Sequence, residues 1–298
     1  MKKALFLARD LPYISRMAQT PPVVLSIAGF DPSSGAGITA DIKTIAAHGC
    51  YGLSCITALT IQSTQGVRRV EPVSGKLIGE TLRELANDIP IAAVRIGMLG
   101  NAEVVGAVGD FLASARLPNV VLDPILKSTS GTKLLNNGAP EKLRALLPLA
   151  YVLTPNIDEA AALTGVPVTN LDQMKVAALK LHDMGAVNVV VTGGHLEKAI
   201  DLLSVKQPEG PPKQTEFGSN LLRSNSTHGT GCAFATAIAC NLALGRQLAD
   251  AVIMAKVYVT KAIAKAYPLG KGAGPLHHLY RMDETPRSAA EFVEPVHR

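Results

Sequence analysis

A short run near residue 230 combines glycines, a threonine and a cysteine directly before a helix of small residues. The run is Asn225-Ser226-Thr227-His228-Gly229-Thr230-Gly231-Cys232. Glycine allows left-handed backbone angles and leaves no side chain between backbone and ligand. The first turn of a helix offers unpaired N–H groups and the positive end of the helix dipole, so Gly229, Thr230 and Gly231 are expected to bind an anion such as a phosphate.

Cys232 falls in the first turn of this expected helix. At such a position the pKa of a thiol tends to be lowered, which would make Cys232 a candidate acid or base. A tight glycine loop that ends on a buried cysteine explains the same residues equally well.

Composition limits the kinds of partner. The chain has 298 residues, 47% of them hydrophobic, which suits a large α/β domain with a sizeable core. Tryptophan is absent and aromatic residues make up 4%, which argues against platforms for stacking nucleic-acid bases. The net charge of +5 is carried by scattered lysines and arginines, so it fits small anionic substrates better than nucleic acid.

The four cysteines are Cys50, Cys55, Cys232 and Cys240, and none forms a Cys-x-x-Cys motif. Their pattern predicts neither a zinc site nor a disulfide framework and is typical of a reducing cytoplasm. No apolar run is long enough to span a membrane. Residues 1–20 are interpreted as an N-terminal extension, because residues 1–16 show no pattern that would pack with the rest of the chain. Their apolar stretch is too short for a signal peptide.

Strand and helix patterns alternate along most of the chain. Expected strands cover residues 23–28, 55–61, 92–98, 119–122, 151–154 and 187–191, and expected helices cover 35–48, 74–87, 102–115, 140–147, 157–163, 171–184, 231–244 and 247–266. Residues 63–73 could form a flap, and residues 196–227 are expected to form antiparallel strands. The pattern predicts one domain, residues 21–298, with a mostly parallel sheet covered by helices on both faces.

In an open α/β sheet, ligands bind beyond the carboxyl ends of the strands. The polar or chemically useful residues expected there are Asp31, Gln62, Met98, Asp123, Asn156 and Thr192. Some of them could instead serve only the local fold. Asp31 and Asp123 precede prolines and can cap turns, and Asn156 with Glu159 can form a capping box. Asp41 can be a helix residue that faces water.

Only weak signs of a common nucleotide-binding motif are present. Residues 35–40 match the Gly-x-Gly-x-x-Ala dinucleotide fingerprint, but the loop before the first glycine is too long and no acidic residue ends the next strand. No P-loop motif occurs in the sequence.

An ordered series of motifs resembles hydroxymethylpyrimidine/phosphomethylpyrimidine kinases over residues 23–268. The series begins with residues 28–41 and continues with 56–59, Gln62, 96–99, 123–124, 154–156, 159–160, Gly193-Gly194-His195 and 228–232. Residues 1–20 and those after Tyr280 lie outside the resemblance. It implies a ribokinase-like fold, a three-layer α/β/α arrangement, ATP with Mg²⁺, and two successive phosphorylations in thiamin synthesis.

The resemblance also implies roles for individual residues. Gly29, Asp41, Gln62 and Met98 would line the pyrimidine pocket. The amides of residues 229–232 would hold the transferring phosphoryl group, and the Cys232 side chain would accept the proton of the substrate hydroxyl or orient that hydroxyl.

The resemblance assigns Asn156 and Glu159 to Mg²⁺, through water, with support from Asp123. The chain departs from the family pattern at Phe30, Lys127 and Thr192. Thr192 stands where many members carry a lysine near the ATP phosphates, and Lys127 would supply the missing charge. A homodimer is expected. A pyridoxal kinase of the same superfamily and a catalytically silent pyrimidine sensor remain alternatives.

Overall fold

The computed structural model describes residues 20–127, 131–132, 134–135, 139–194, 199–219, 224 and 226–284. Residues 1–19, which form nearly all of the predicted N-terminal extension, and residues 285–298 lie outside these ranges. His195, the last residue of the Gly-Gly-His motif, lies outside them too. None of the helices in the described ranges combines the length and the apolarity that crossing a membrane requires.

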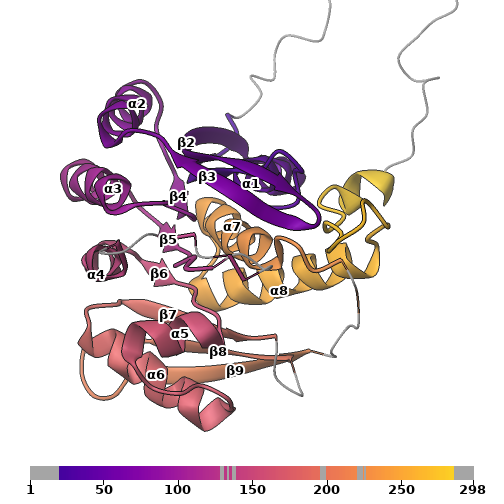
Figure 1. Ribbon diagram of the computed structural model, residues 1–298. Helices are drawn as coiled ribbons and strands as arrows, with labels where there is room; N and C mark the ends of the chain where they lie inside the picture. Colours follow the sequence, from indigo (N-terminus) through magenta and orange to yellow (C-terminus); the bar gives the residue numbers. More distant parts are fainter. Residues whose placement is uncertain are drawn as a thin grey trace, which may run out of the picture.

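One mixed sheet of nine strands forms the centre of the molecule (Figure 1). The strands are β1 (Val23–Phe30), β2 (Tyr51–Ser63), β3 (Gly66–Pro72), β4 (Ala93–Ile96), β5 (Val120–Leu122), β6 (Val152–Leu153), β7 (Asn188–Gly193), β8 (Ala199–Val205) and β9 (Lys213–Ser219). Their order is β3-β2-β1-β4-β5-β6-β7-β8-β9. The central strands β2, β1, β4, β5, β6 and β7 are parallel to one another. Strand β3 at one edge and strands β8 and β9 at the other are antiparallel to their neighbours.

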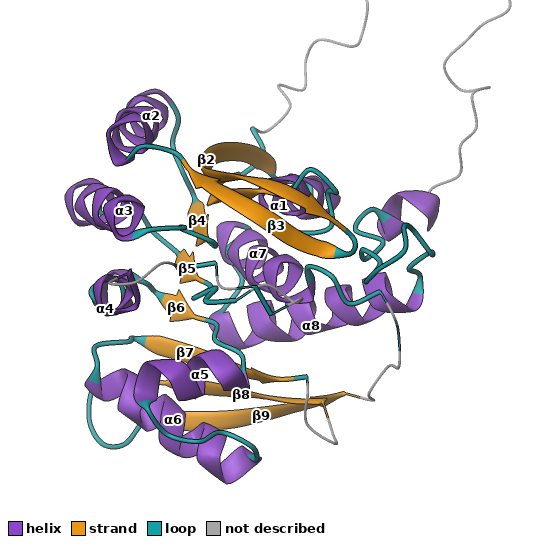
Figure 2. Cartoon of the chain, in the orientation of Figure 1, coloured by secondary structure: helices purple, strands orange, loops and turns teal. Residues whose placement is uncertain are grey.

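Helices cover both faces of the sheet (Figure 2). One face carries α1 (Gly37–Ala47), α7 (Thr230–Ala243) and α8 (Leu248–Ala264), and the other carries α2 (Gly75–Asp88), α3 (Ala102–Ala115), α4 (Ala139–Arg144), α5 (Ile157–Thr164) and α6 (Leu171–Asp183). The 3₁₀ helices η1 (Leu147–Leu149) and η2 (Tyr280–Glu284) complete the described elements. Two large apolar clusters, one on each face, form the core.

The central strands have apolar residues without interruption because both of their faces are buried. In β1, Val23, Leu25 and Ile27 belong to the core beneath α2 and α3, whereas Val24 belongs to the core beneath α7 and α8. This alternation confirms the predicted three-layer arrangement.

The predicted elements are confirmed apart from their end residues, with three differences. The predicted helix 140–147 is divided into α4, which ends at Arg144, and the 3₁₀ helix η1, which begins at Leu147. Strand β2 begins at Tyr51, four residues before the predicted start, because residues 51–54 extend the parallel pairing with β1. The predicted flap at residues 63–73 forms the antiparallel strand β3 instead, and it pairs with the second half of β2.

The chain changes direction across the sheet at β1. Strands β2 and β3 lie on one side of β1, and β4 and all later strands lie on the other. The loops after β1 and β4 therefore diverge, and open α/β sheets bind ligands at the carboxyl ends of the strands at such a point. The long helix α7 begins at this same edge, since its first turn contacts the loop after β1.

Candidate functional site

The first turn of α7 is built closely against the loop that follows β1. Gly229 caps the helix with a φ of 81°, a left-handed conformation that favours glycine. A Cβ atom at Gly229 would lie 1.9 Å from the carbonyl oxygen of Gly35, so any other residue would force the two loops apart. Gly231 is exposed, and a Cβ atom there would meet nothing within 4 Å, so the first turn is open on that side.

Backbone donors at this turn are available to a ligand. The N–H of Ala233 makes the first helical bond, to the carbonyl oxygen of Gly229, at 2.9 Å. The N–H groups of Gly231 and Cys232 precede this bond and have no backbone acceptor among the described residues. These two amides can therefore bind an anion at the positive end of the helix dipole.

Cys232 lies beneath these amides and is almost completely buried. Its sulfur interacts with the backbone N–H of Gly37, at the start of α1, and with the guanidinium of Arg95. Burial nevertheless raises the pKa of the Cys232 thiol to about 11, with Asp123 and Asp41 adding to the shift and Arg95 opposing it. The predicted lowering of this pKa was wrong, because desolvation of the thiolate outweighs the nearby cation and amide.

Arg95 is the centre of a buried charged cluster, which comprises Asp41, Arg95, Asp123 and Cys232. Its side chain has no exposed surface and extends from β4 over Gly97, where a Cβ atom would lie 1.8 Å from Nη1. Nη1 lies 3.1 Å from Oδ2 of Asp41, and Nη2 lies 2.8 Å from Oδ2 of Asp123. Only glycine at position 97 leaves room for a guanidinium between the two carboxylates.

Asp41, which was predicted to line the pyrimidine pocket, is fully buried. Its carboxylate oxygens accept hydrogen bonds from Ser26 at 2.6 Å, from Thr236 at 2.7 Å and from Arg95. Asp41 therefore does not face water, which excludes that alternative. The geometry assigns Asp41 to holding Arg95, and direct contact between Asp41 and a pyrimidine stays a prediction.

Asp123, Glu159 and Asn156 lie together at the ends of β5 and β6. Burial raises the pKa of Asp123 to about 6, and Arg95 opposes the shift. Burial and then the charge of Asp123 raise the pKa of Glu159 to about 8. Asn156 caps α5 in a complete capping box, in which Glu159 accepts from the backbone N–H of Asn156 at 3.0 Å and returns its own N–H to the Asn156 side chain at 2.9 Å.

Thr192 joins this group, whereas Lys127 is less closely connected. Thr192 forms a bridge with Asn156 and donates its N–H to the carbonyl oxygen of Pro155 at 2.9 Å. Lys127 is exposed in the loop after β5. The preceding residue, Leu126, donates its backbone N–H to Glu159. The role of Lys127 near the ATP phosphates stays a prediction.

Gly29 and Met98 meet at the ends of β1 and β4. A Cβ atom on Gly29 would lie 3.0 Å from the sulfur of Met98, so the glycine allows close packing of the two strand ends. The hydroxyl of Thr57 donates to the carbonyl oxygen of Met98 at 2.5 Å and holds this backbone in place. Met98 also packs with Ala58 and Leu134 in a small apolar cluster.

Gln62 belongs to a second polar group, which we call the recognition cluster and which comprises Asp31, Thr60, Gln62 and His228. Nε2 of His228 lies 2.8 Å from Oδ2 of Asp31 and 3.3 Å from Nε2 of Gln62. Asp31 also accepts from the backbone N–H groups of Ser33 and Ala36, which confirms the turn-capping alternative for it.

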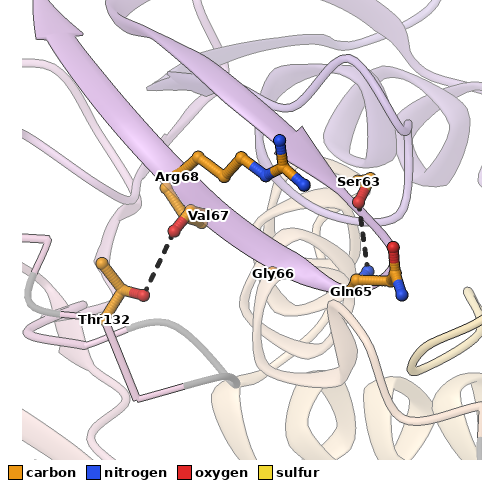
Figure 3. A pocket seen from close by; sticks show the side chains of 6 residues that line it. All are labelled: Ser63, Gln65, Gly66, Val67, Arg68 and Thr132. Atoms are coloured by element: carbon orange, nitrogen blue, oxygen red, sulfur yellow. Dashed lines mark hydrogen bonds between the residues drawn. The ribbon is translucent and has the colours of Figure 1, made fainter.

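A polar cavity of about 360 Å³ opens beside the β2–β3 hairpin (Figure 3). Thr132 lies across from β3 there and donates its hydroxyl to the carbonyl oxygen of Val67 at 3.4 Å (Figure 3). Besides Thr132 and Val67, the residues that line the cavity are Ser63, Gln65, Gly66 and Arg68. The cavity borders β2, the strand that carries Gln62.

Sequence reasoning missed Arg95 and His228. A signal for Arg95 was present, because a charged residue in the otherwise apolar strand β4 must find buried partners. His228 was quoted only as part of the glycine motif, and its contacts to Asp31 and Gln62 join residues separated by 197 and 166 positions. Such long-range contacts leave no local pattern in a single sequence.

Comparisons with known proteins identify the family of the chain. The sequence profile of the phosphomethylpyrimidine kinase family matches residues 31–277. The chain is 42% identical to the hydroxymethylpyrimidine/phosphomethylpyrimidine kinase of Haemophilus influenzae over 257 residues, 86% of this chain and 96% of that protein. It is also 42% identical to the thiamine biosynthesis bifunctional protein ThiED of Geobacter sulfurreducens over 88% of this chain, but this match spans only 53% of ThiED.

Solved structures show the same fold. A phosphomethylpyrimidine kinase from Clostridium difficile is 38% identical, with a TM-score of 0.72, and the match covers 81% of this chain and 99% of that one. The pyridoxal kinase of Bacillus subtilis, in an ADP complex, is 32% identical with a TM-score of 0.78 over 88% of this chain and 99% of that one. The chain therefore belongs to the phosphomethylpyrimidine kinase family, whose members are phosphotransferases.

Proposed function

We propose that the chain transfers the γ-phosphoryl group of ATP to 4-amino-5-hydroxymethyl-2-methylpyrimidine and to its monophosphate, in thiamine biosynthesis. One observation carries this proposal. The amides of Gly231 and Cys232, which have no backbone acceptor among the described residues, belong to the same helical turn as the Cys232 thiol that contacts Arg95, at the carboxyl edge of the sheet where α/β proteins bind ligands. Family membership supports the same reaction, and it speaks against the predicted alternative of a catalytically silent sensor.

Phosphoryl transfer requires positioning and charge stabilisation more than covalent chemistry from the protein. The Gly231 and Cys232 amides would bind the oxygens of the transferring group. In the first transfer the substrate hydroxyl would attack the γ-phosphorus, the bond from this phosphorus to the bridging oxygen of the β-phosphate would break so that ADP leaves, and the proton would pass to the thiolate form of Cys232. In the second transfer a phosphate oxygen of the monophosphate would attack in place of the hydroxyl. Because burial raises the pKa of this thiol to about 11, most Cys232 is protonated at neutral pH and orients the hydroxyl. Arg95 would stabilise the thiolate that can accept the proton.

The residues present fit Mg²⁺. Within the described ranges, no three His, Cys, Asp or Glu side chains form a closed metal cage. Mg²⁺ does not need such a cage, because it keeps several waters and uses one or two carboxylates with substrate phosphates. The hard oxygen atoms of Asp123 and Glu159, with Asn156 beside them, would hold it. Bound there, it would neutralise charge on the ATP phosphates.

A pyridoxal kinase activity is the second candidate. It is favoured by the fold similarity to the Bacillus subtilis pyridoxal kinase and by the hydroxymethyl group that pyridoxal shares with the pyrimidine. The pyrimidine is favoured by Gln62, because a side-chain amide matches an amino group beside a ring nitrogen.

A substrate panel tests the proposal. The protein is incubated with Mg-ATP and the aminopyrimidine alcohol, its monophosphate or pyridoxal, and ADP formation is measured. We expect turnover with both pyrimidines at a higher kcat/KM than with pyridoxal. Preference for pyridoxal would support the second candidate, and no turnover with any of the three would contradict both.

Two further expectations belong to this proposal. All four cysteines are free, which supports a reducing cytoplasm as the site of the reaction. The homodimer stays a prediction, and sedimentation of the purified protein at several concentrations would test it.

A further inference from the structure

The recognition cluster contains a hydrogen-bonding conflict that one change resolves. Nε2 of His228 lies 2.8 Å from the Asp31 carboxylate and 3.3 Å from Nε2 of Gln62. Burial raises the pKa of Asp31, but hydrogen bonds from His228, Ser33 and Ala36 outweigh it, so this carboxylate is ionised and accepts only. Nε2 of His228 must therefore carry a proton, and two N–H donors then face each other.

A second conflict lies at the other end of the Gln62 amide. The hydroxyl of Thr60 lies 2.9 Å from the carbonyl oxygen of Phe30 and 3.2 Å from Oε1 of Gln62. A hydroxyl has a single hydrogen to donate. Because the Phe30 carbonyl can only accept, the Thr60 hydrogen belongs to it, and Oε1 of Gln62 then faces an oxygen lone pair.

Turning the Gln62 amide by half a turn removes both conflicts. Oxygen and nitrogen of an amide are nearly isosteric, so the surrounding partners decide which end is which. In the turned orientation Oε1 shares the single Nε2–H of His228 with the Asp31 carboxylate, and Nε2 donates to the Thr60 hydroxyl. We infer that His228 and Thr60 are positioning residues that fix this single orientation of the Gln62 amide and thereby determine which heterocycle the site selects.

The fixed amide leaves one N–H and one oxygen lone pair for a ligand. A 4-aminopyrimidine offers the complementary edge, a ring-nitrogen acceptor next to an amino donor, which a glutamine amide matches as it does in adenine recognition. A 4-oxopyrimidine offers the reverse order, an N–H donor next to a carbonyl acceptor. A freely turning amide would accept both edges, whereas an amide held from both ends accepts only the first.

The surroundings of His228 explain why it can hold this position. Its side chain is only 12% exposed, and its ring lies over Gly35, where a Cβ atom would come within 2.2 Å of the ring. Its backbone N–H donates to the carbonyl oxygen of Gly274 at 3.1 Å. The ring is therefore packed against the loop after β1 while its Nε2 faces Asp31 and Gln62.

This inference rests on the proposed function, and binding separates the two. Calorimetry measures the Kd of the aminopyrimidine alcohol and of its 4-oxo analogue for the full-length protein, for His228→Leu and for Thr60→Val. We expect the wild type to prefer the amino compound. Each variant should reduce this preference by roughly tenfold or more, because the amide can then turn to suit the 4-oxo compound. Thr215→Val in β9 is the matched control and should keep the wild-type preference.

The outcomes are distinct. His228→Gln keeps an N–H donor and should recover part of the preference, which a purely structural role of His228 would not explain. Equal weakening of both ligands in His228→Leu and Thr60→Val, with an unchanged ratio, would overturn the inference, as would a wild type that binds both ligands equally. Selective binding without turnover would contradict the proposed function and leave the inference standing.

Discussion

The charged cluster around Arg95 and the recognition cluster around His228 lie at the same edge of the sheet but differ in burial and charge. The Arg95 side chain is completely buried between two carboxylates, whereas the His228 side chain is 12% exposed. Losing Arg95 or one of its two carboxylate partners leaves an uncompensated charge away from water, which is strongly destabilising. Losing a member of the second leaves polar groups that water can partly satisfy.

The difference separates two tasks. The charged cluster includes Cys232, next to the amides that would hold the phosphoryl group, so its members should affect stability and kcat. The recognition cluster orients Gln62, so its members should affect substrate binding and selectivity. Four predictions test this division, in order of decreasing effect.

Replacing Arg95 should have the largest effect. Arg95→Leu leaves Asp41 and Asp123 without their cation, and we expect a loss of about 3–5 kcal/mol in the free energy of unfolding together with a loss of activity. Urea unfolding measures the first effect. The control is Arg69→Leu, because Arg69 and Glu71 form an exposed pair at 2.9 Å and its loss should change stability little. Similar stabilities of the two variants would show that the buried cluster is not essential to folding.

Replacing Cys232 should mainly lower kcat. Cys232→Ala removes the proton acceptor but keeps the backbone amides. We therefore expect kcat to fall by roughly 10²–10⁴-fold and KM for ATP to stay unchanged. Steady-state kinetics measure both. Cys240→Ala, in the same helix and away from the first turn, should keep kcat. A near-normal kcat in Cys232→Ala would reduce this residue to packing, and catalysis would rest on positioning by residues 229–231.

Replacing Gln62 should affect recognition alone. Gln62→Ala leaves the polar edge of the pyrimidine without its partner, which costs about 1–3 kcal/mol. KM for the pyrimidine should rise while KM for ATP barely moves. Gln65→Ala, at the exposed tip of the same hairpin, is the control. An equal rise of both KM values would show that Gln62 does not act specifically in pyrimidine binding.

The smallest effect concerns thiol reactivity. Cys50 and Cys232 are equally exposed, at 8% each. A hydrogen bond with Cys240 lowers the pKa of Cys50, whereas burial raises that of Cys232 to about 11. The thiolate is the nucleophile, so at neutral pH iodoacetamide should modify Cys50 first. Modification of Cys232 should accelerate as the pH rises towards 11, and peptide mass spectrometry measures both rates. Faster labelling of Cys232 than of Cys50 at pH 7 would instead indicate a lowered pKa at the helix start.

The alternating pattern predicted most of the fold because it reflects local physics. Buried parallel strands need continuous apolar runs, and helices such as α3 reveal themselves through their period. The start of β2 and the conversion of the expected flap into β3 were missed, because both depend on pairing with a neighbouring strand. The capping box of Asn156 and Glu159 was recognisable from spacing, since both residues lie within one helical turn.

The sequence by itself determined the glycine turn before α7, the order of strands and helices, and the family to which the chain belongs. Tertiary structure alone decided the pKa of Cys232, the burial of Asp41 and the contacts of Arg95 and His228. The physical reason is that a pKa depends on the surrounding dielectric and charges, which residues distant in the chain supply. The Cys232 thiol meets Gly37, Arg95 and Asp123 only after α1, β4 and β5 have packed around α7.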